Sequence, residues 1–550
     1  MPTLKVTPRP KSMTTARSTP KSQRRASSTG AAPLDCATHE RMIANLAKVL
    51  QKTQGKRAQL FRTHISSILV CGENAYKFRR PVKLPFADFS TLKHRTDDCW
   101  REWRLNQRTA APLYVGVVQI TGTPDAPSIG GHGVALDTAL QMQRFKQTDL
   151  LSHLVQTQQL SAAMVTSLGN HLGEFMHQLP PLPVTAFEGQ RTTIEWLRDS
   201  LDEIIAIKPE AAHQMQNIAL WANKTHRRLK HTIRSRQKQG FYRDGHGDLH
   251  LDNLVRYNGR VMAFDALEFN TALRQTDMIN DIAFTFMDLL AAGRADLAWT
   301  LINAWCEQTG DYDGLKLLRF YTLYRAVVRA KVAAMTEEAA RFERYKSLAL
   351  RLIAPANPPR LILLSGLSGS GKSTVAADMA RELSAIRLRA DVVRKHLFAN
   401  CLDNHDLLYS PAATQNTYAE LARLAKQLLE KHMTVIVDAT FLSQTHVNRF
   451  NRLARTLDIE CQVFECHAPL SVLRRRITLR ASQKTDPSDA TLKVLEQQVH
   501  QQQSKPVHWP VNITRINTNC SRARLANRTR MLVQGILTGY TSHLRPYDAN

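Results

Sequence analysis

The chain has 550 residues, enough for two to four globular domains, and its 74 Lys and Arg residues outnumber its 47 Asp and Glu residues. The resulting net charge of +27 favours anionic ligands, among them nucleotides, phosphorylated substrates and nucleic acid. The eight cysteines include no C-x-x-C pair, which argues against a zinc site or a disulfide framework, and no apolar run approaches the roughly 18 residues that span a bilayer. We therefore expect a cytoplasmic protein without a membrane span.

The N-terminal part of the chain is expected to contain a basic tail and a small α+β lobe. Residues 1–37 are rich in Lys, Arg, Ser, Thr and Pro, a composition typical of a disordered tail, with an organellar transit peptide as the alternative. Alternating apolar runs on either side of Gly72 predict a β-hairpin. The elements expected in order are a helix over 39–51, the hairpin over 60–70 and 75–78, a charged helix over 92–108 and a strand over 113–121.

A longer, mostly helical region follows up to residue 353. Helical patterns are predicted over 136–238, 277–290, 294–309 and 315–353, with short loops and strands only over 241–268. The first of these stretches ends in a basic run, His226 to Lys238. Such a run is typical of a solvated helix face, and a surface for nucleic acid or for an acidic partner is the alternative.

A catalytic motif lies where the helices are interrupted. The stretch His246-Gly-Asp248-Leu-His250-Leu-Asp-Asn253 is followed by Asp265. An Asp in a tight loop can orient or deprotonate an acceptor hydroxyl, whereas an Asn and an Asp at the later positions can ligate the Mg²⁺ that bridges the phosphates of ATP. The spacing therefore predicts phosphoryl transfer from ATP with Mg²⁺ as cofactor.

This motif matches H-G-D-x-H-x-x-N, and the region resembles the catalytic core of the aminoglycoside phosphotransferases. The resemblance implies an α+β protein-kinase-like fold for residues 38–353. The roles it implies are Asp248 as catalytic base, His246 and His250 as supports of the catalytic loop, and Asn253 and Asp265 as Mg²⁺ ligands.

A kinase-like site also needs a lysine on an early strand and a glutamate on the following helix, which holds that lysine in place. Lys77 and Glu102 occur in that order. No G-x-G-x-x-G loop precedes them, because the hairpin has the sequence Thr63-His-Ile-Ser66-Ser67-Ile. The sequence therefore leaves open whether this domain binds ATP.

A proline-rich linker at residues 354–359 separates the helical region from the rest of the chain, because proline cannot continue a helix. Beyond it, apolar runs alternate with helical patterns, which predicts a parallel α/β sheet. The strands are expected at 360–365, 386–390, 433–438, 460–466 and 511–517.

The first of these strands leads into a phosphate-binding loop, because residues 366–374 match G-x-x-x-x-G-K-[ST]. Glycines let backbone N–H groups surround the β-phosphate, Lys372 reaches the β- and γ-phosphates, and the Ser373 hydroxyl ligates Mg²⁺. Residues 360–550 are therefore predicted to form an α/β P-loop NTPase domain. The predicted nucleotide-binding residues of the loop are Gly366, Ser368, Gly369, Ser370, Gly371, Lys372, Ser373 and Thr374.

Two acidic residues at strand ends complete the predicted P-loop site. Asp438 ends an apolar strand, as a Walker B carboxylate near Mg²⁺ does. Asp391 follows another strand, with Arg394 one turn later. Asp391 is expected to accept the proton of an incoming hydroxyl, and the alternative is that it only caps the helix that begins there.

These features resemble the polynucleotide-kinase-like and zeta-toxin-like P-loop kinases, which are often described as AAA-type ATP-binding domains. The resemblance implies that Arg474, Arg476 and Arg480, which precede the segment 486–490, form a lid over the γ-phosphate. The two halves in this order resemble the bacterial family of bifunctional aminoglycoside phosphotransferase/ATP-binding proteins.

The expected function is phosphoryl transfer to a small hydroxylated molecule, which the sequence does not identify. One alternative is a P-loop ATPase switch joined to a degenerate kinase-like binding module. Another is a nucleic-acid-associated kinase or binder, which the net charge of +27 favours. No helix-turn-helix, zinc-finger or RNA-binding aromatic motif supports that third reading. The oligomeric state is not predicted.

Overall fold

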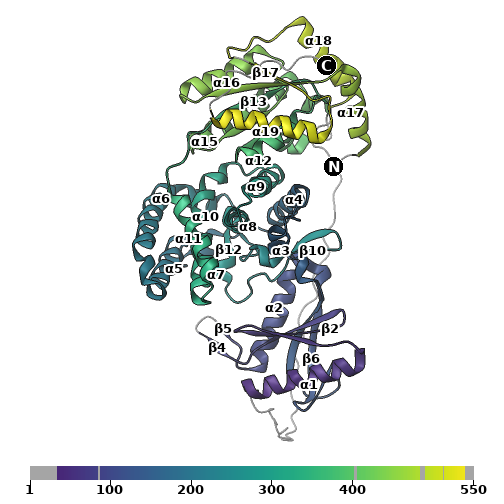
Figure 1. Cartoon of the computed structure of the whole chain (residues 1–550), viewed down its shortest axis with the longest axis vertical. Helices are drawn as coiled ribbons and strands as arrows, with labels where there is room; N and C mark the ends of the chain where they lie inside the picture. Colours follow the sequence, from purple (N-terminus) through teal and green to yellow (C-terminus); the bar gives the residue numbers. More distant parts are fainter. Residues whose placement is uncertain (1–33, 85–86, 402–404, 484–489, 512, 539–550) are drawn as a thin grey trace, which may run out of the picture.

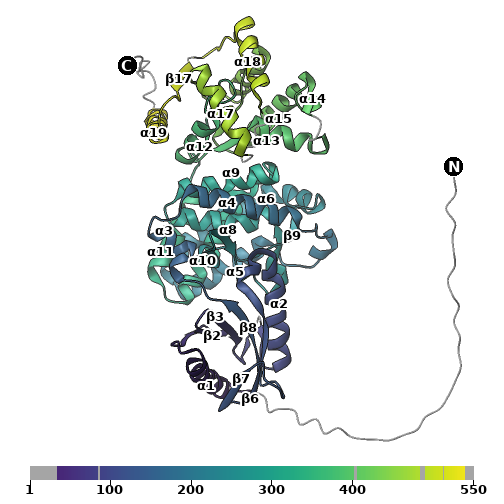
Figure 2. The same ribbon diagram turned by 90° about the vertical axis from the view of Figure 1, so that its right-hand side faces the viewer.

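The computed structural model describes residues 34–538, except 85–86, 402–404, 484–489 and 512. An antiparallel sheet with two helices, a helical block and a parallel sheet flanked by helices follow one another along the long axis (Figures 1 and 2). The first two parts form the N-terminal domain, and the third is the P-loop domain. Every helix in the described part of the chain is too short or too polar to traverse a bilayer.

Of the basic tail expected at residues 1–37, residues 1–33 lie outside the described residues. The prediction of a disordered tail is wrong for residues 36 and 37, because helix α1 (Cys36–Gln54) begins there. The Asp35 side chain accepts a hydrogen bond from the backbone N–H of Thr38 and caps the helix, and Gly55 ends it in a left-handed conformation.

The N-terminal sheet has the strand order β1-β2-β3-β8-β6-β7, with all neighbours antiparallel. Helix α1 covers one face, and helix α2 (Leu92–Ala110) covers the other. The strands are β1 (Gln59–Arg62), β2 (Ser66–Cys71), β3 (Asn74–Arg79), β6 (Tyr114–Thr123), β7 (Ala126–Ile129) and β8 (Asp137–Gln143), beside the short pair β4 (Lys83–Leu84) and β5 (Ala87–Asp88).

The helical pattern predicted from residue 136 was wrong at its start, because residues 137–143 form the central strand β8. Ala139 packs in the cluster beneath α1, whereas Leu140 and Met142 pack in the cluster beneath α2. A strand buried on both faces lacks the polar and apolar alternation that distinguishes a half-buried strand from a helix.

Alternation along β3 determines which side chains face which helix. Tyr76 and Phe78 pack under α1, so Lys77 and Arg79 point to the opposite face, toward α2. This places two cations beside the acidic residues of α2.

The helical block surrounds α8, which is buried at nearly every position. The basic run at 226–238 ends α6, and it includes Arg236, which is buried between Asp277 and Asp311 rather than solvated. The helices are α3 (Leu151–Gln156), α4 (Ala162–Gln178), α5 (Thr193–Ile207), α6 (Ala212–Lys238), α7 (Thr271–Arg274), α8 (Met278–Ala291), α9 (Ala295–Thr309), α10 (Leu318–Met335) and α11 (Ala339–Ile353). Two small antiparallel pairs accompany them: β9 (Tyr242–Asp244) with β12 (Gln275–Asp277), and β10 (Leu254–Tyr257) with β11 (Arg260–Ala263).

The P-loop domain contains a parallel sheet, which in the described residues has the strand order β14-β15-β13-β16-β17. Its strands are β13 (Leu361–Ser365), β14 (Ile386–Arg389), β15 (Val435–Asp438), β16 (Cys461–His467) and β17 (Ile513–Asn517). Its helices are α12 (Lys372–Glu382), α13 (Ala390–Leu397), α14 (His405–Leu408), α15 (Pro411–Leu429), α16 (Gln444–Thr456), α17 (Leu470–Gln483), α18 (Leu492–Ser504) and α19 (Arg522–Thr538).

Strand β13 is buried on both faces and therefore joins two cores. Leu361 and Leu363 belong to the cluster that includes α15 and α16, whereas Ile362 and Leu364 belong to the cluster that includes α12 and α19. Helices thus cover both faces of the sheet, as a parallel sheet requires.

Candidate functional sites

The phosphate-binding loop connects β13 to α12 and depends on glycine at three positions. Gly366, Gly369 and Gly371 have φ values of +135°, +78° and +86°. A Cβ atom at Gly366 would collide with the carbonyl oxygen of Cys466, and one at Gly369 would lie 2.9 Å from that of Leu473. Only glycine tolerates both the left-handed backbone and the close approach.

Polar groups of this loop have local partners that a phosphate would replace. The Lys372 ammonium donates to the Leu367 carbonyl oxygen at 2.9 Å, and the Ser368 N–H donates to the Gln498 side chain at 2.9 Å. The buried Ser370 hydroxyl has no hydrogen-bond partner among the described residues. Burial lowers the pKa of Lys372, although Asp438 opposes that effect. These donors suit an anion with several oxygens.

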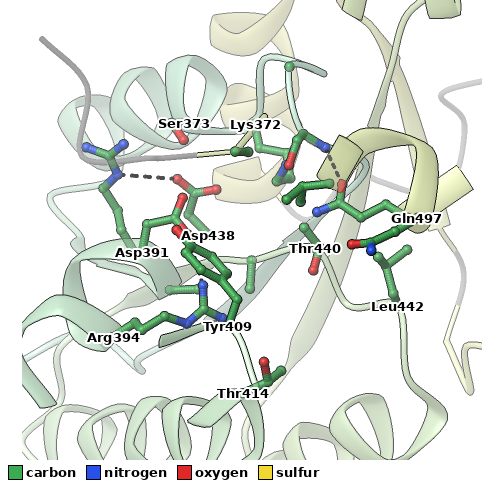
Figure 3. Close-up of a pocket in the computed structure, with 18 of the residues that line it drawn as sticks. Lys372, Ser373, Asp391, Arg394, Tyr409, Thr414, Asp438, Thr440, Leu442 and Gln497 are labelled. Carbon is green, nitrogen blue, oxygen red and sulfur yellow. Dashed lines mark hydrogen bonds and ion pairs between the residues drawn. The ribbon is translucent and has the colours of Figure 1, made fainter. Parts of the chain in front are cut away.

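A cavity of about 390 Å³ opens beside the loop (Figure 3). Asp391 and Asp438 line it opposite the loop, at the carboxyl ends of β14 and β15. Gly366 and Ser370 belong to the loop without lining the cavity. The predicted residues that do line it are Ser368, Gly369, Gly371, Lys372, Ser373, Thr374, Asp391, Asp438 and Arg480.

The other end of the cavity is aromatic and was not predicted from the sequence. The Arg394 guanidinium lies over the Tyr409 ring, 4.6 Å from its centroid, and 3.4 Å from a carboxylate oxygen of Asp391. The His446 ring stacks on Tyr418 with the centroids 3.6 Å apart. Burial, together with a nearby arginine, lowers the pKa of His446 to about 4, so this ring is neutral near pH 7. These residues line the same cavity as the phosphate-binding loop.

The three arginines expected to form a lid have different surroundings. Arg480 lines the cavity and donates to the Ala490 carbonyl oxygen at 3.3 Å. Arg476 also lines the cavity and supports the loop, because its guanidinium donates to the Gly369 carbonyl oxygen at 3.1 Å. Arg474 is half-exposed, lies outside the cavity and pairs with Glu496, so its role in a lid stays a prediction. The segment 486–489 lies outside the described residues.

In the N-terminal domain, the lysine and two of the predicted acids lie together. The Lys77 ammonium is 2.8 Å from Glu102 and 2.7 Å from Asp265. Burial alone would raise the pKa of Asp265, but the Lys77 charge lowers it to about 2. Both carboxylates in turn overcome the effect of burial on Lys77 and raise its pKa. A charged trio from β3, α2 and the segment after β11 is therefore assembled.

A second cation, which the sequence analysis missed, lies two residues further along β3. The buried Arg79 guanidinium is 2.6 Å from Asp98 and 2.7 Å from Glu102, and it also contacts Glu268. Burial raises the pKa of Glu268 to about 7 against the opposing effect of Arg79. The three carboxylates cluster as metal ligands would, but Arg79 already contacts all of them. Sequence spacing offered one signal, since Lys77 and Arg79 share a face of the strand.

The predicted catalytic loop is held by its own side chains and by α8. The Asn253 amide donates to an Asp248 carboxylate oxygen at 2.9 Å, and His250 lies 3.2 Å from the same carboxylate. Burial would raise the pKa of Asp248, but His250 lowers it. His246 is fully buried, and Asp281 of α8 accepts its backbone N–H at 2.8 Å. His246 thus supports the loop and does not face the cleft.

A second cavity, of about 700 Å³, extends from the Lys77 trio between the sheet and the helical block. Lys77, Glu102 and Asp265 line one end, whereas Asp248 and Asn253 do not line it. Most of its exposed lining is apolar, although Arg144 and Lys146 also line it. The apolar lining residues are Phe61, Ile68, Val70, Ala75, Met142, Phe145 and Phe264.

Residues 361–504 match the family model of the AAA domain. Among solved structures, the APS kinase CysC of Mycobacterium tuberculosis with AMPPNP and APS is 23% identical, covering 33% of this chain and 99% of that one at a TM-score of 0.25. A gluconokinase from Sinorhizobium meliloti 1021 is 16% identical, covering 34% and 100% at a TM-score of 0.26. A choline kinase from Cryptosporidium parvum Iowa II is 9% identical, covering 57% and 94% at a TM-score of 0.38.

Longer matches come from mycobacteria. The uncharacterized protein Rv2004c of Mycobacterium tuberculosis is 30% identical over an alignment of 455 positions that covers 77% of this chain and 86% of that protein. The uncharacterized protein Mb2027c of Mycobacterium bovis matches with the same identity and coverage. The alignment is too long to be confined to the P-loop domain. The chain therefore belongs to the same family as these mycobacterial proteins.

Proposed function

We propose that the chain is an ATP- and Mg²⁺-dependent phosphotransferase with one nucleotide site in each domain, and that it acts on a small hydroxylated molecule. The observation that carries this proposal is that Lys372, Ser373, Asp391 and Asp438 line one cavity at the carboxyl ends of parallel strands. Ligands of open α/β sheets bind at this edge.

The P-loop site has a donor set that fits ATP and Mg²⁺. The glycine loop leaves no room for a Cβ and offers backbone N–H groups, so it suits a phosphate chain. The Ser373 hydroxyl and the Asp438 carboxylate are hard oxygen ligands of the kind that Mg²⁺ takes. Bound Mg²⁺ would neutralise charge on the phosphate oxygens.

The acceptor end of this site supplies the remaining chemistry. In the proposed reaction the Asp391 carboxylate accepts the proton of the acceptor hydroxyl, whose oxygen forms a bond to the γ-phosphorus while the bond from that phosphorus to the β,γ-bridging oxygen breaks. Lys372 and Arg480 hold the phosphate oxygens, and Arg394 orients the acceptor.

The N-terminal site supports the proposal in a different way. Lys77 stands between Glu102 and Asp265, the arrangement that a kinase-like domain uses to hold ATP phosphates and Mg²⁺. Asp248 is proposed as the base, with Asn253 and Asp265 as Mg²⁺ ligands. An assembled trio favours a working site over a degenerate binding module. We accordingly propose an α+β protein-kinase-like fold for this domain.

Calorimetric titration of Mg²⁺-ATP into the full-length protein tests the proposal. Two sites are expected, of which Lys372→Ala removes one and Asp265→Ala the other. Asp125→Ala is a matched control, because it removes an exposed carboxylate that pairs with Arg41 at 3.4 Å. A single site that is lost only with Lys372→Ala would replace the proposal with an ATPase switch.

A further inference from the structure

Helix α9 of the N-terminal domain packs against helix α12 of the P-loop domain (Figures 1 and 2). It also contacts strand β14 of that domain. Strand β14 is an edge strand, so one row of its backbone groups faces away from the sheet. The Asn303 side chain donates to the Ala385 carbonyl oxygen at 2.9 Å and accepts the Arg387 N–H at 2.7 Å. The N-terminal domain thus satisfies two backbone groups at this edge.

One turn further along α9, Glu307 reaches two arginines of β14. Its carboxylate is 2.5 Å from the Arg387 guanidinium and 3.3 Å from that of Arg389. All three side chains are nearly buried, with exposed fractions of 13%, 14% and 9%. An ion pair removed from water in this way holds its partners more firmly than a surface pair does.

Both arginines continue to the P-loop site. The Arg387 guanidinium donates to the Ser373 carbonyl oxygen at 3.2 Å, at the start of α12. The Arg389 guanidinium lies 3.8 Å from a carboxylate oxygen of Asp438 and lines the nucleotide cavity. Glu307 therefore contacts both proposed Mg²⁺-binding residues indirectly, Ser373 through Arg387 and Asp438 through Arg389, although it belongs to the other domain.

We propose that Glu307 is a positioning residue of the P-loop site, supplied by the N-terminal domain, that keeps Arg389 from pairing closely with Asp438. This inference rests on the proposed function of that site. A carboxylate that accepts a close ion pair from arginine is a poorer metal ligand, because the cation and the guanidinium compete for the same oxygens. Glu307 balances the Arg389 charge from the opposite side and leaves Asp438 available for Mg²⁺.

The test measures the binding of a fluorescent ATP analogue to the full-length protein as Mg²⁺ is titrated. Binding to the P-loop site is the part of the fluorescence signal that is lost in Lys372→Ala. A wild-type protein without such a signal would contradict the proposed function of this site itself. In Glu307→Gln, the Mg²⁺ concentration at half-saturation should rise roughly tenfold, the loss typical of an outer-sphere partner. Binding of the analogue without Mg²⁺ should not weaken.

A double variant distinguishes an effect of Glu307 on Arg389 from a general loss of structure. In Arg389→Gln, adding Glu307→Gln should change the Mg²⁺ requirement little, because the competing guanidinium is gone. The matched control is Glu203→Gln, which removes a half-exposed carboxylate that pairs with Lys331 at 3.4 Å. An unchanged Mg²⁺ requirement in Glu307→Gln overturns the inference. An equal loss of analogue binding with and without Mg²⁺ also overturns it. A tenfold rise in the Mg²⁺ requirement that Glu307→Gln still causes in the Arg389→Gln variant overturns it as well.

Discussion

The neighbouring cations of β3 should have separable roles, Lys77 in nucleotide binding and Arg79 in stability. Lys77→Met removes pairs to Glu102 and Asp265. Glu102 keeps its pair with Arg79, and the Asp265 side chain is 40% exposed and hence partly solvated. We therefore expect a cost of only about 1–2 kcal/mol in unfolding free energy, together with loss of one of two ATP sites.

Arg79→Met should have the opposite profile. The Asp98, Glu102 and Glu268 side chains are all at most 5% exposed, so removing Arg79 leaves three buried carboxylates with less compensation. Breaking a buried ion pair from one side costs about 3–5 kcal/mol. For a large domain this lowers the melting temperature by roughly 6–10 °C, compared with about 2–4 °C for Lys77→Met.

Differential scanning calorimetry with an ATP titration of each variant distinguishes these outcomes. Lys83→Met, which removes a 77% exposed lysine, is the matched control. Equal destabilisation by Lys77→Met and Arg79→Met would show that Lys77 is structural. An Arg79→Met protein that melts within a degree or two of wild type would refute the burial argument.

Three further outcomes are expected of single substitutions. Lys372→Ala should abolish most nucleotide binding by the P-loop domain in the full-length protein, as measured by calorimetry; unchanged affinity would contradict the loop assignment. Asp248→Ala should remove phosphoryl transfer by the N-terminal domain while costing about 1 kcal/mol, because the carboxylate is 32% exposed; a large fall in melting temperature would instead indicate a structural role. His446 binds fewer protons in the folded state than in the unfolded state between pH 6.5 and about 4, so wild type should lose stability as pH falls through this window. His446→Phe, which keeps the stack on Tyr418, should flatten that loss, which melting curves at pH 7, 6 and 5 would detect.

The P-loop could be predicted from the sequence because its residues lie close together in the chain. The glycines, Lys372 and Ser373 act through a backbone loop between adjacent elements, so the spacing of the motif already specifies their geometry. Lys77, Glu102 and Asp265 could also be ordered correctly, because each follows a recognisable strand or helix.

Arg79 and Glu307 could not be found in this way, since their roles depend on tertiary packing. Arg79 resembles any other basic residue on a strand until α2 and the segment containing Glu268 close over it. Glu307 resembles a solvated charge near a helix end, and only the docking of β14 gives it buried partners. Strand β8 was missed for a related reason. It is buried on both faces, so its sequence lacks the alternation of polar and apolar residues that predicts a strand.

Helices α8 and α9 connect the two candidate sites physically. Asp281 of α8 accepts the backbone N–H groups of His246 and Gly247 in the N-terminal loop, and α9, which packs on α8, carries Glu307 at the P-loop domain. A fragment that begins in the linker would lack α9, expose the outer edge of β14 and leave its arginines without Glu307. Measurements on such a fragment would therefore describe different surroundings of Arg389 and Asp438, and the two candidate sites are best compared in the full-length chain, where the same helix pair supports both.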